Sequence, residues 1–164
     1  MALAMAASWS VLAKAGDAEA PAAALLDKYA TVRLEADLSG LSFLQRQTLP
    51  LLIQAADIMD DLFWQQAYGD RNGLLDSIGD PGLRRFAAIN YGPWDRLDGD
   101  RPFIAGAGAK PPGAQFYPPD MTREEFEAAP LDDKTSWFTL LRRDAENRLV
   151  TIPYHQAYAV QLAR

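Results

Sequence analysis

The strongest periodic pattern of apolar positions lies between residues 42 and 66. Apolar and small side chains recur there at helical spacing, while Asp57, Asp60 and Asp61 lie on or near the opposite face. Such a stripe predicts an amphipathic helix whose apolar side faces a core. We interpret the aspartates as a solvated face, with metal binding as the alternative. The predicted core-facing stripe comprises Leu52, Ala55, Ala56, Met59, Leu62, Phe63 and Gln66.

Both ends of this helix carry boundary signals. Ser42 is a good N-cap residue, and Gln45 follows three positions later, which completes a capping box. Gly69 is typical of the residue just beyond a helix C-terminus. Pro50 lies inside the pattern and predicts a kink or a fresh start.

Three shorter helices are predicted. The clearest start is at Asp80, a good N-cap, and Pro81, which suits the first helical position; this helix ends at residues 91–93. The other two helices lie around residues 74–78 and over residues 123–128.

The remaining pattern predicts strands and a long loop. Residues 136–154 alternate and then become rich in β-formers, which predicts a β-hairpin with a turn at residues 144–147. Residues 155–164 resemble the first turns of another helix, and residues 25–38 suggest a short extended segment. Residues 94–119 are rich in glycine, proline and aromatics, which favours a packed loop. We therefore expect an α+β fold, predominantly helical, with a β-hairpin near the C-terminus.

The first 24 residues differ from the rest. Residues 2–13 form an apolar, alanine-rich run that is too short to span a bilayer as a helix. An A-x-A cleavage pattern follows at residues 13–15, although no basic residue precedes the run. We expect residues 1–24 to be a signal peptide and linker and residues 25–164 to form the folded part. The expected location is periplasmic or secreted, with the cytoplasm as the alternative.

Composition narrows the classes of function. The 164 residues carry a net charge of −6, which argues against nucleic-acid binding. The sequence has no cysteine and one histidine, His155, so a thiolate site or a two-histidine zinc site cannot be built within it. His155 is interpreted as a structural or surface residue, with proton transfer as the alternative. We accordingly assign no catalytic residue and no metal ligand to this chain.

Residues 90–96 form the most suggestive cluster of side chains. Asn90, Tyr91, Trp94, Asp95 and Arg96 place an amide, two aromatic rings and an acid–base pair directly after a predicted helix. Ligand clefts combine flat apolar walls with a few oriented polar groups in this way. The alternative is a buried aromatic corner that fastens the loop to the helices. These five residues are the candidate substrate contacts.

An acidic run follows this cluster at residues 95–100. Its spacing does not match a calcium loop, because the third position, Leu97, offers no oxygen ligand. We interpret the run as an acidic surface turn.

Four stretches in order resemble the amino-terminal region of bacterial proteins of the dipeptidyl peptidase III family. They are IMDDLFWQQ at residues 58–66, NYGPWDRL at 90–97, FYPPDMT at 116–122 and IPYH at 152–155. The resemblance runs from about Tyr29 onward. Members of this family are zinc-dependent exopeptidase-like hydrolases.

The resemblance implies a two-lobed fold around a wide cleft, of which this chain supplies a partial lobe. The zinc motif of the family lies downstream, so the implied cofactor is zinc in the complete protein and none in this chain. The implied partners are the downstream zinc-bearing lobe and a peptide substrate, with no nucleic acid and no stable membrane span. Some relatives are fused to Nudix domains, but this sequence contains no Nudix box.

Two other interpretations stay open from the sequence. The chain could be a self-contained, non-enzymatic binding or scaffold module, or a small hydrolase that uses Asp and Glu carboxylates. Generic carboxylates alone support the hydrolase.

Overall fold

The computed structural model describes residues 22–163, which are predominantly helical with two small antiparallel sheets. This agrees in outline with the predicted fold class. The expected signal peptide and most of the expected linker lie outside the described residues, which include only residues 22–24 of that segment. Within residues 22–163, no helix is long and apolar enough to cross a membrane.

Helix α2, Phe43–Ala67, begins and ends where the sequence predicts. The Ser42 side chain accepts from the Gln45 N–H, and the Gln45 side chain accepts from the Ser42 N–H, which confirms the capping box. Gly69, with φ of 108°, donates its N–H to the Trp64 carbonyl and closes the helix. The helix runs through Pro50 without a break, so the predicted fresh start there is wrong.

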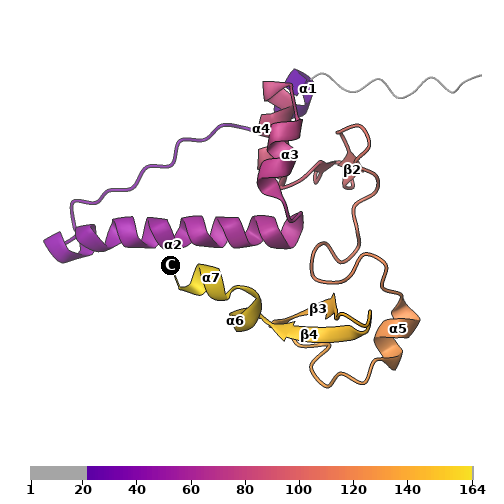
Figure 1. Cartoon of the computed structure of the whole chain (residues 1–164). Helices are drawn as coiled ribbons and strands as arrows, with labels where there is room; N and C mark the ends of the chain where they lie inside the picture. The colour runs from indigo at the N-terminus through magenta and orange to yellow at the C-terminus, as the bar shows by residue number, and fades with distance from the viewer. Residues whose placement is uncertain (1–21, 164) are drawn as a thin grey trace, which may run out of the picture.

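Three helices gather around the C-terminal end of α2 (Figure 1). They are α1, Ala22–Leu26; α3, Arg71–Ser77; and α4, Pro81–Asn90. The aromatic ring of Phe86 is fully buried between them and meets Tyr29 and Phe103 edge to face, with ring centroids 5.8 and 4.6 Å away. The buried cluster comprises Leu25, Trp64, Leu74, Ile78, Phe86, Ala87 and Phe103.

Helix α1 crosses the boundary that the sequence suggested between residues 24 and 25. Its Leu25 is buried against the cluster around α4. Residues 30–38, expected to be extended, contain neither helix nor strand, and the chain runs alongside α2 to reach its start (Figure 1).

The second half of the chain holds the strands. β1, Trp94–Asp95, pairs with β2, Arg101–Pro102, and β3, Thr139–Arg143, pairs with β4, Leu149–Pro153, both antiparallel. The β3–β4 pair lies where the sequence predicts a hairpin. The last helices are α5, Arg123–Ala128; α6, Tyr154–Ala157; and α7, Ala159–Leu162.

The loop between β2 and α5 is packed, as its aromatic residues predicted. Phe103 is buried, and the N–H of Gln115 donates to the Gln66 carbonyl of α2 at 3.0 Å. The N–H of Leu141 in turn donates to the Phe116 carbonyl at 3.0 Å. The loop therefore links α2 to the β3–β4 sheet.

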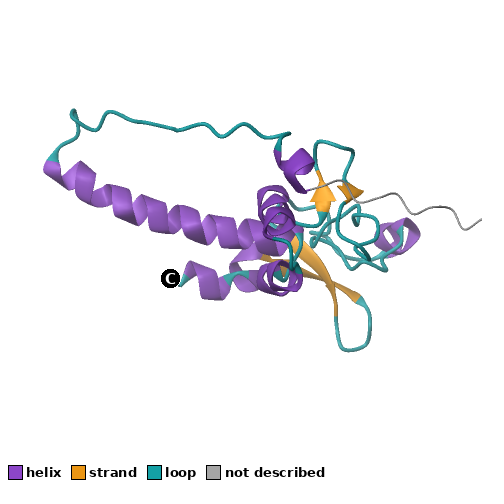
Figure 2. Cartoon of the chain, turned by 90° about the horizontal axis from the view of Figure 1, so that it is seen from above, coloured by secondary structure: helices purple, strands orange, loops and turns teal. Residues whose placement is uncertain are grey.

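The apolar stripe of α2 does not face a core, so that prediction is wrong for this chain. Leu52 and Met59 are 60% and 64% exposed, and Trp64 is the buried residue of the helix. The reason is geometric: the N-terminal half of α2 extends past the other elements (Figures 1 and 2). Nothing among residues 22–163 covers it.

Candidate functional site

Residues 90–96 connect α4 to β1 through a tight change of direction. Tyr91 adopts the left-handed conformation (φ 54°, ψ 39°), which ends the helix, and Gly92 donates its N–H to the Ala87 carbonyl at 3.1 Å. The next residues extend, and Trp94 enters β1.

Asn90 is buried and organises this connection. Its amide nitrogen donates to the Phe86 carbonyl at 3.0 Å. Its oxygen accepts from the Arg96 backbone N–H at 3.0 Å and from the Tyr29 hydroxyl at 3.1 Å. These contacts satisfy the amide within the protein, so Asn90 fixes the loop that carries the other candidates.

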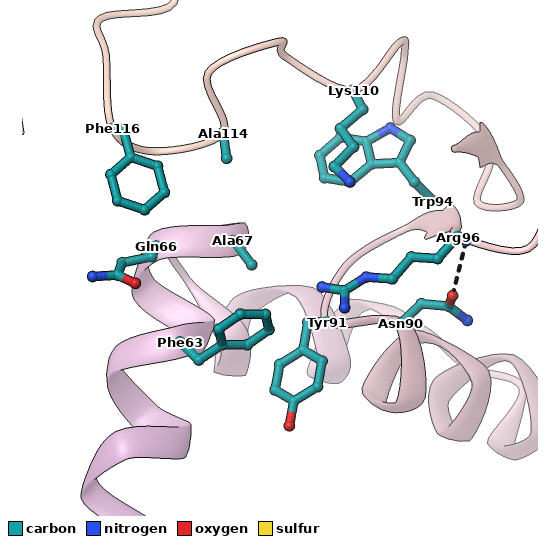
Figure 3. A pocket seen from close by; sticks show the side chains of 10 residues that line it. All are labelled: Phe63, Gln66, Ala67, Asn90, Tyr91, Trp94, Arg96, Lys110, Ala114 and Phe116. Carbon is teal, nitrogen blue, oxygen red and sulfur yellow. Dashed lines mark hydrogen bonds between the residues drawn. The ribbon is translucent and has the colours of Figure 1, made fainter. Parts of the chain in front are cut away.

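A cavity of about 180 Å³ lies between the C-terminal end of α2, the 90–96 segment and the loop that follows β2 (Figure 3). Four of the five candidate substrate contacts line it. The lining residues are Phe63, Gln66, Ala67, Asn90, Tyr91, Trp94, Arg96, Lys110, Ala114 and Phe116.

Tyr91 forms the lower wall of the cavity together with Phe63. Their rings meet edge to face at 4.6 Å, and the Tyr91 hydroxyl donates to Asp60 of α2. This hydrogen bond, followed by burial, raises the pKa of the Tyr91 hydroxyl above its ordinary value. A carboxylate oxygen of Asp60 also lies 3.5 Å from the Arg71 guanidinium, so Asp60 links α2 to α3.

Two cations border the cavity. The Arg96 guanidinium carbon lies 5.4 Å from the ring centroids of both Phe63 and Tyr91. The Lys110 ammonium is 2.8 Å from Asp100 of the β1–β2 turn. The heads of both side chains point into the space between the aromatic walls (Figure 3).

Trp94 supplies the opposite wall. It is buried, and its indole N–H donates to the Gly108 carbonyl at 3.0 Å. This bond ties the ring to the glycine-rich part of the loop and leaves a face available to the cavity.

Asp95, the fifth candidate, does not line the cavity. It is buried and ion-paired with Lys28, and its hydrogen bond raises the pKa of that ammonium. Its second carboxylate oxygen accepts from the Leu97 N–H at 3.0 Å. Through these contacts Asp95 holds the β1–β2 turn in place.

The sequence did not single out six of the lining residues as site residues. Phe63, Gln66 and Ala67 belong to one helical turn of α2, so their spacing offered a signal. Lys110, Ala114 and Phe116 come from a loop without periodicity, and their approach to α2 depends on tertiary contacts such as the Gln115–Gln66 hydrogen bond.

A zinc site does not fit the residues that the structure describes. Between residues 22 and 163, no group of three or more His, Asp or Glu side chains is arranged to hold a metal ion. His155 is exposed on α6, away from the cavity.

The chain is similar to two solved structures and to one curated protein. No family model matches the chain. The dipeptidyl peptidase III structure from Caldithrix abyssi is 39% identical and superposes with a TM-score of 0.76 over 85% of this chain and 29% of its own. Dipeptidyl peptidase III from Corallococcus sp. strain EGB is 32% identical, with a TM-score of 0.75 over 86% of this chain and 29% of its own.

A curated plant protein is also similar. Nudix hydrolase 3 of Arabidopsis thaliana is 30% identical over 166 residues, which cover 76% of this chain and 22% of the plant protein. The chain thus spans less than a third of the length of each of these relatives.

Proposed function

Because the chain is similar in fold and in sequence to one part of dipeptidyl peptidase III, we propose that it forms part of the substrate cleft of a zinc-dependent, dipeptidyl-peptidase-like hydrolase that acts on peptides. The structural similarity over 85% of the chain carries this proposal. Under this proposal, residues 25–164 belong to a peptidase-like domain, and the catalytic and zinc-binding residues belong to another part of the protein.

The share of the relatives that the chain covers supports a larger protein. About seven-tenths of each dipeptidyl peptidase III chain has no counterpart here. That remainder is the natural partner of this segment, and it would supply the metal ligands that residues 22–163 do not assemble.

The exposed length of α2 supports the same view. Leu51, Leu52 and Ile53 are each about 60% exposed, and consecutive helical residues point about 100° apart. Apolar side chains therefore occupy more than one face of the helix. A helix of this kind is usually buried in the core of a larger structure.

The cavity supports a role in binding rather than in chemistry. Tyr91, Trp94 and Phe63 provide flat apolar walls, Arg96 provides a cation, and Asn90 holds the segment in place. In the proposed enzyme these groups orient part of a peptide while the reaction takes place at residues outside this chain. Asp95 contributes by anchoring the turn.

The name of the plant relative suggests Nudix chemistry as a second function. The match covers 22% of that protein, and the sequence of this chain has no Nudix box. No group in the cavity favours that assignment, and we do not propose it.

A chimera tests the proposal. Residues 22–163 replace the matching segment of the Caldithrix abyssi enzyme, and dipeptide release from the N-terminus of peptides is measured together with zinc content. We expect a folded, zinc-loaded chimera that retains dipeptidyl peptidase activity. A chimera that folds and holds zinc but releases no dipeptide would overturn the proposal.

Two substitutions in the chimera then test whether the cavity contributes to peptide binding: Trp94→Ala and its control, Arg101→Gln. Trp94 lines the cavity, whereas Arg101 is exposed on β2 and pairs with Asp98. We expect Trp94→Ala to raise KM for peptides and Arg101→Gln to leave it unchanged.

A further inference from the structure

The cavity beside residues 90–96 is electrostatically unlike the rest of the molecule. The whole chain carries a net charge of −6, yet the cavity is lined by two cations, Arg96 and Lys110, and by no carboxylate. A positive site within an acidic protein favours an anionic ligand.

Arg96 is the cation that remains available to a ligand. Lys110 is already paired with Asp100, whereas no carboxylate among residues 22–163 forms an ion pair with the exposed Arg96 guanidinium. The guanidinium lies over the Phe63 and Tyr91 rings, and Asn90 holds the Arg96 backbone. A planar guanidinium in a fixed position matches the two oxygens of a carboxylate.

The size of the cavity limits what else can enter. Its volume of about 180 Å³ is smaller than the roughly 300–1,000 Å³ of pockets that hold whole drug-sized ligands. The space suits one amino-acid side chain. Its walls are the rings of Phe63, Trp94 and Phe116 and the methyl groups of Ala67 and Ala114, which favour an apolar or aromatic group.

We infer that this cavity is a subsite for one residue of a peptide, an aromatic or large aliphatic residue next to a carboxylate that pairs with Arg96. The inference rests on the proposed peptide-cleft function and specifies the class of peptide. The carboxylate can belong to the peptide C-terminus or to a neighbouring acidic side chain, which share the same chemistry.

A binding experiment on the full 164-residue chain tests this subsite. The ligands are N-acetylphenylalanine, its carboxamide, and N-acetyl-Glu-Phe-amide, which has an acidic side chain but no terminal acid. The readout is the indole N–H resonance of Trp94 in a ¹H–¹⁵N spectrum, assigned with Trp94→Phe. This N–H bonds to the loop that borders the cavity, so it reports occupancy directly.

We expect N-acetylphenylalanine to bind about tenfold more tightly than its carboxamide, because only the acid can form a charge-assisted hydrogen bond with Arg96. Arg96→Gln should remove this preference, Arg96→Lys should retain part of it, and Arg101→Gln should leave it intact. If N-acetyl-Glu-Phe-amide also outbinds N-acetylphenylalanine amide, a side-chain carboxylate is accepted as well.

Three results would overturn the inference. Equal affinity for acid and amide, or a preference that survives in Arg96→Gln, removes Arg96 as the carboxylate partner but leaves the cleft function standing. If no ligand shifts the Trp94 resonance, the cavity is not a peptide subsite, and the assignment of this cavity to the cleft falls with it.

Discussion

The side-chain oxygen of Asn90 accepts a hydrogen bond from the backbone N–H of Arg96 at 3.0 Å. The same oxygen accepts from the hydroxyl of Tyr29, which follows α1. A single buried amide thus joins the end of α4, the start of the β1–β2 turn and the segment after α1. The aromatic packing of residues 90–96 is present in the structure, and four of these residues also line a cavity, while their role as substrate contacts stays a prediction.

Asn90→Ala should lower the free energy of unfolding by about 1–3 kcal/mol, because it leaves the Arg96 N–H and the Tyr29 hydroxyl without their partner. Urea denaturation monitored by circular dichroism provides the measurement. Asn72→Ala, at an exposed position on α3, is the matched control and should change stability by less than about 0.5 kcal/mol. Equal effects of the two substitutions would contradict the organising role of Asn90.

Tyr91→Phe should cost about 1 kcal/mol of stability at neutral pH through loss of the hydrogen bond to Asp60. The pKa of the Tyr91 hydroxyl is raised in the folded protein, so its contribution is fully present below the ordinary value of about 10 and is lost as pH rises through the folded value. The difference between wild type and Tyr91→Phe should therefore shrink above about pH 10. Urea midpoints measured across this range test the trend.

Tyr117→Phe provides the control for that experiment. Tyr117 is 40% exposed, and its ring meets that of Phe126 edge to face. Its substitution should leave stability nearly unchanged at neutral pH. If wild type and Tyr91→Phe are equally stable at neutral pH, the hydroxyl contributes nothing beyond the ring, and a gap that stays constant through about pH 10 would contradict the titration of this hydrogen bond.

Arg143 should make the β3–β4 region sensitive to acid. Its guanidinium contacts both oxygens of Glu125 at 2.7 and 2.9 Å and Asp120 at 2.9 Å, and it holds the pKa of each carboxyl below its usual range. Stability from these pairs is present above the unfolded values near 4 and is lost as pH falls through the lower folded values. Arg143→Gln should be less stable than wild type at neutral pH, and the difference should narrow at about pH 3.

Arg123→Gln is the comparison for Arg143, because Arg123 forms a single exposed pair with Glu127. Such pairs contribute little to stability. Thermal unfolding at the two pH values distinguishes the variants. An acid response in Arg143→Gln identical to that of wild type would rule out this cluster as the source.

The exposed part of α2 should drive self-association of the isolated chain. Leu52→Glu combined with Met59→Glu should reduce the sedimentation coefficient at high concentration and lower binding of a hydrophobic dye, since both side chains are mostly exposed. Gln47→Glu on the same helix controls for added charge. If the double variant instead unfolds more readily by more than about 1 kcal/mol, these positions are buried in the folded chain.

The helix boundaries could be predicted from the sequence because their signals are local. Ser42 with Gln45, and Asp80 with Pro81, lie within one turn of each other and form the predicted caps. The grouping of residues 90–96 is equally local, and four of them line one cavity, although their contact with substrate stays a prediction.

Other features depend on contacts between distant residues. The approach of Lys110 and Phe116 to α2 follows from loop packing that no period encodes. The apolar period of α2 correctly predicted a helix but not what covers it, since amphipathicity describes a surface and not its partner. The pairing of Asp95 with Lys28 joins residues 67 positions apart, so no local signal distinguishes Asp95 from its neighbours.

Helix α2 extends over 25 residues, about 37 Å at 1.5 Å per residue. One end carries Phe63, Gln66 and Ala67 in the cavity wall, and the other presents its apolar side chains to the surroundings. A single unbroken helix thus connects the wall of the cavity to an apolar surface at its opposite end.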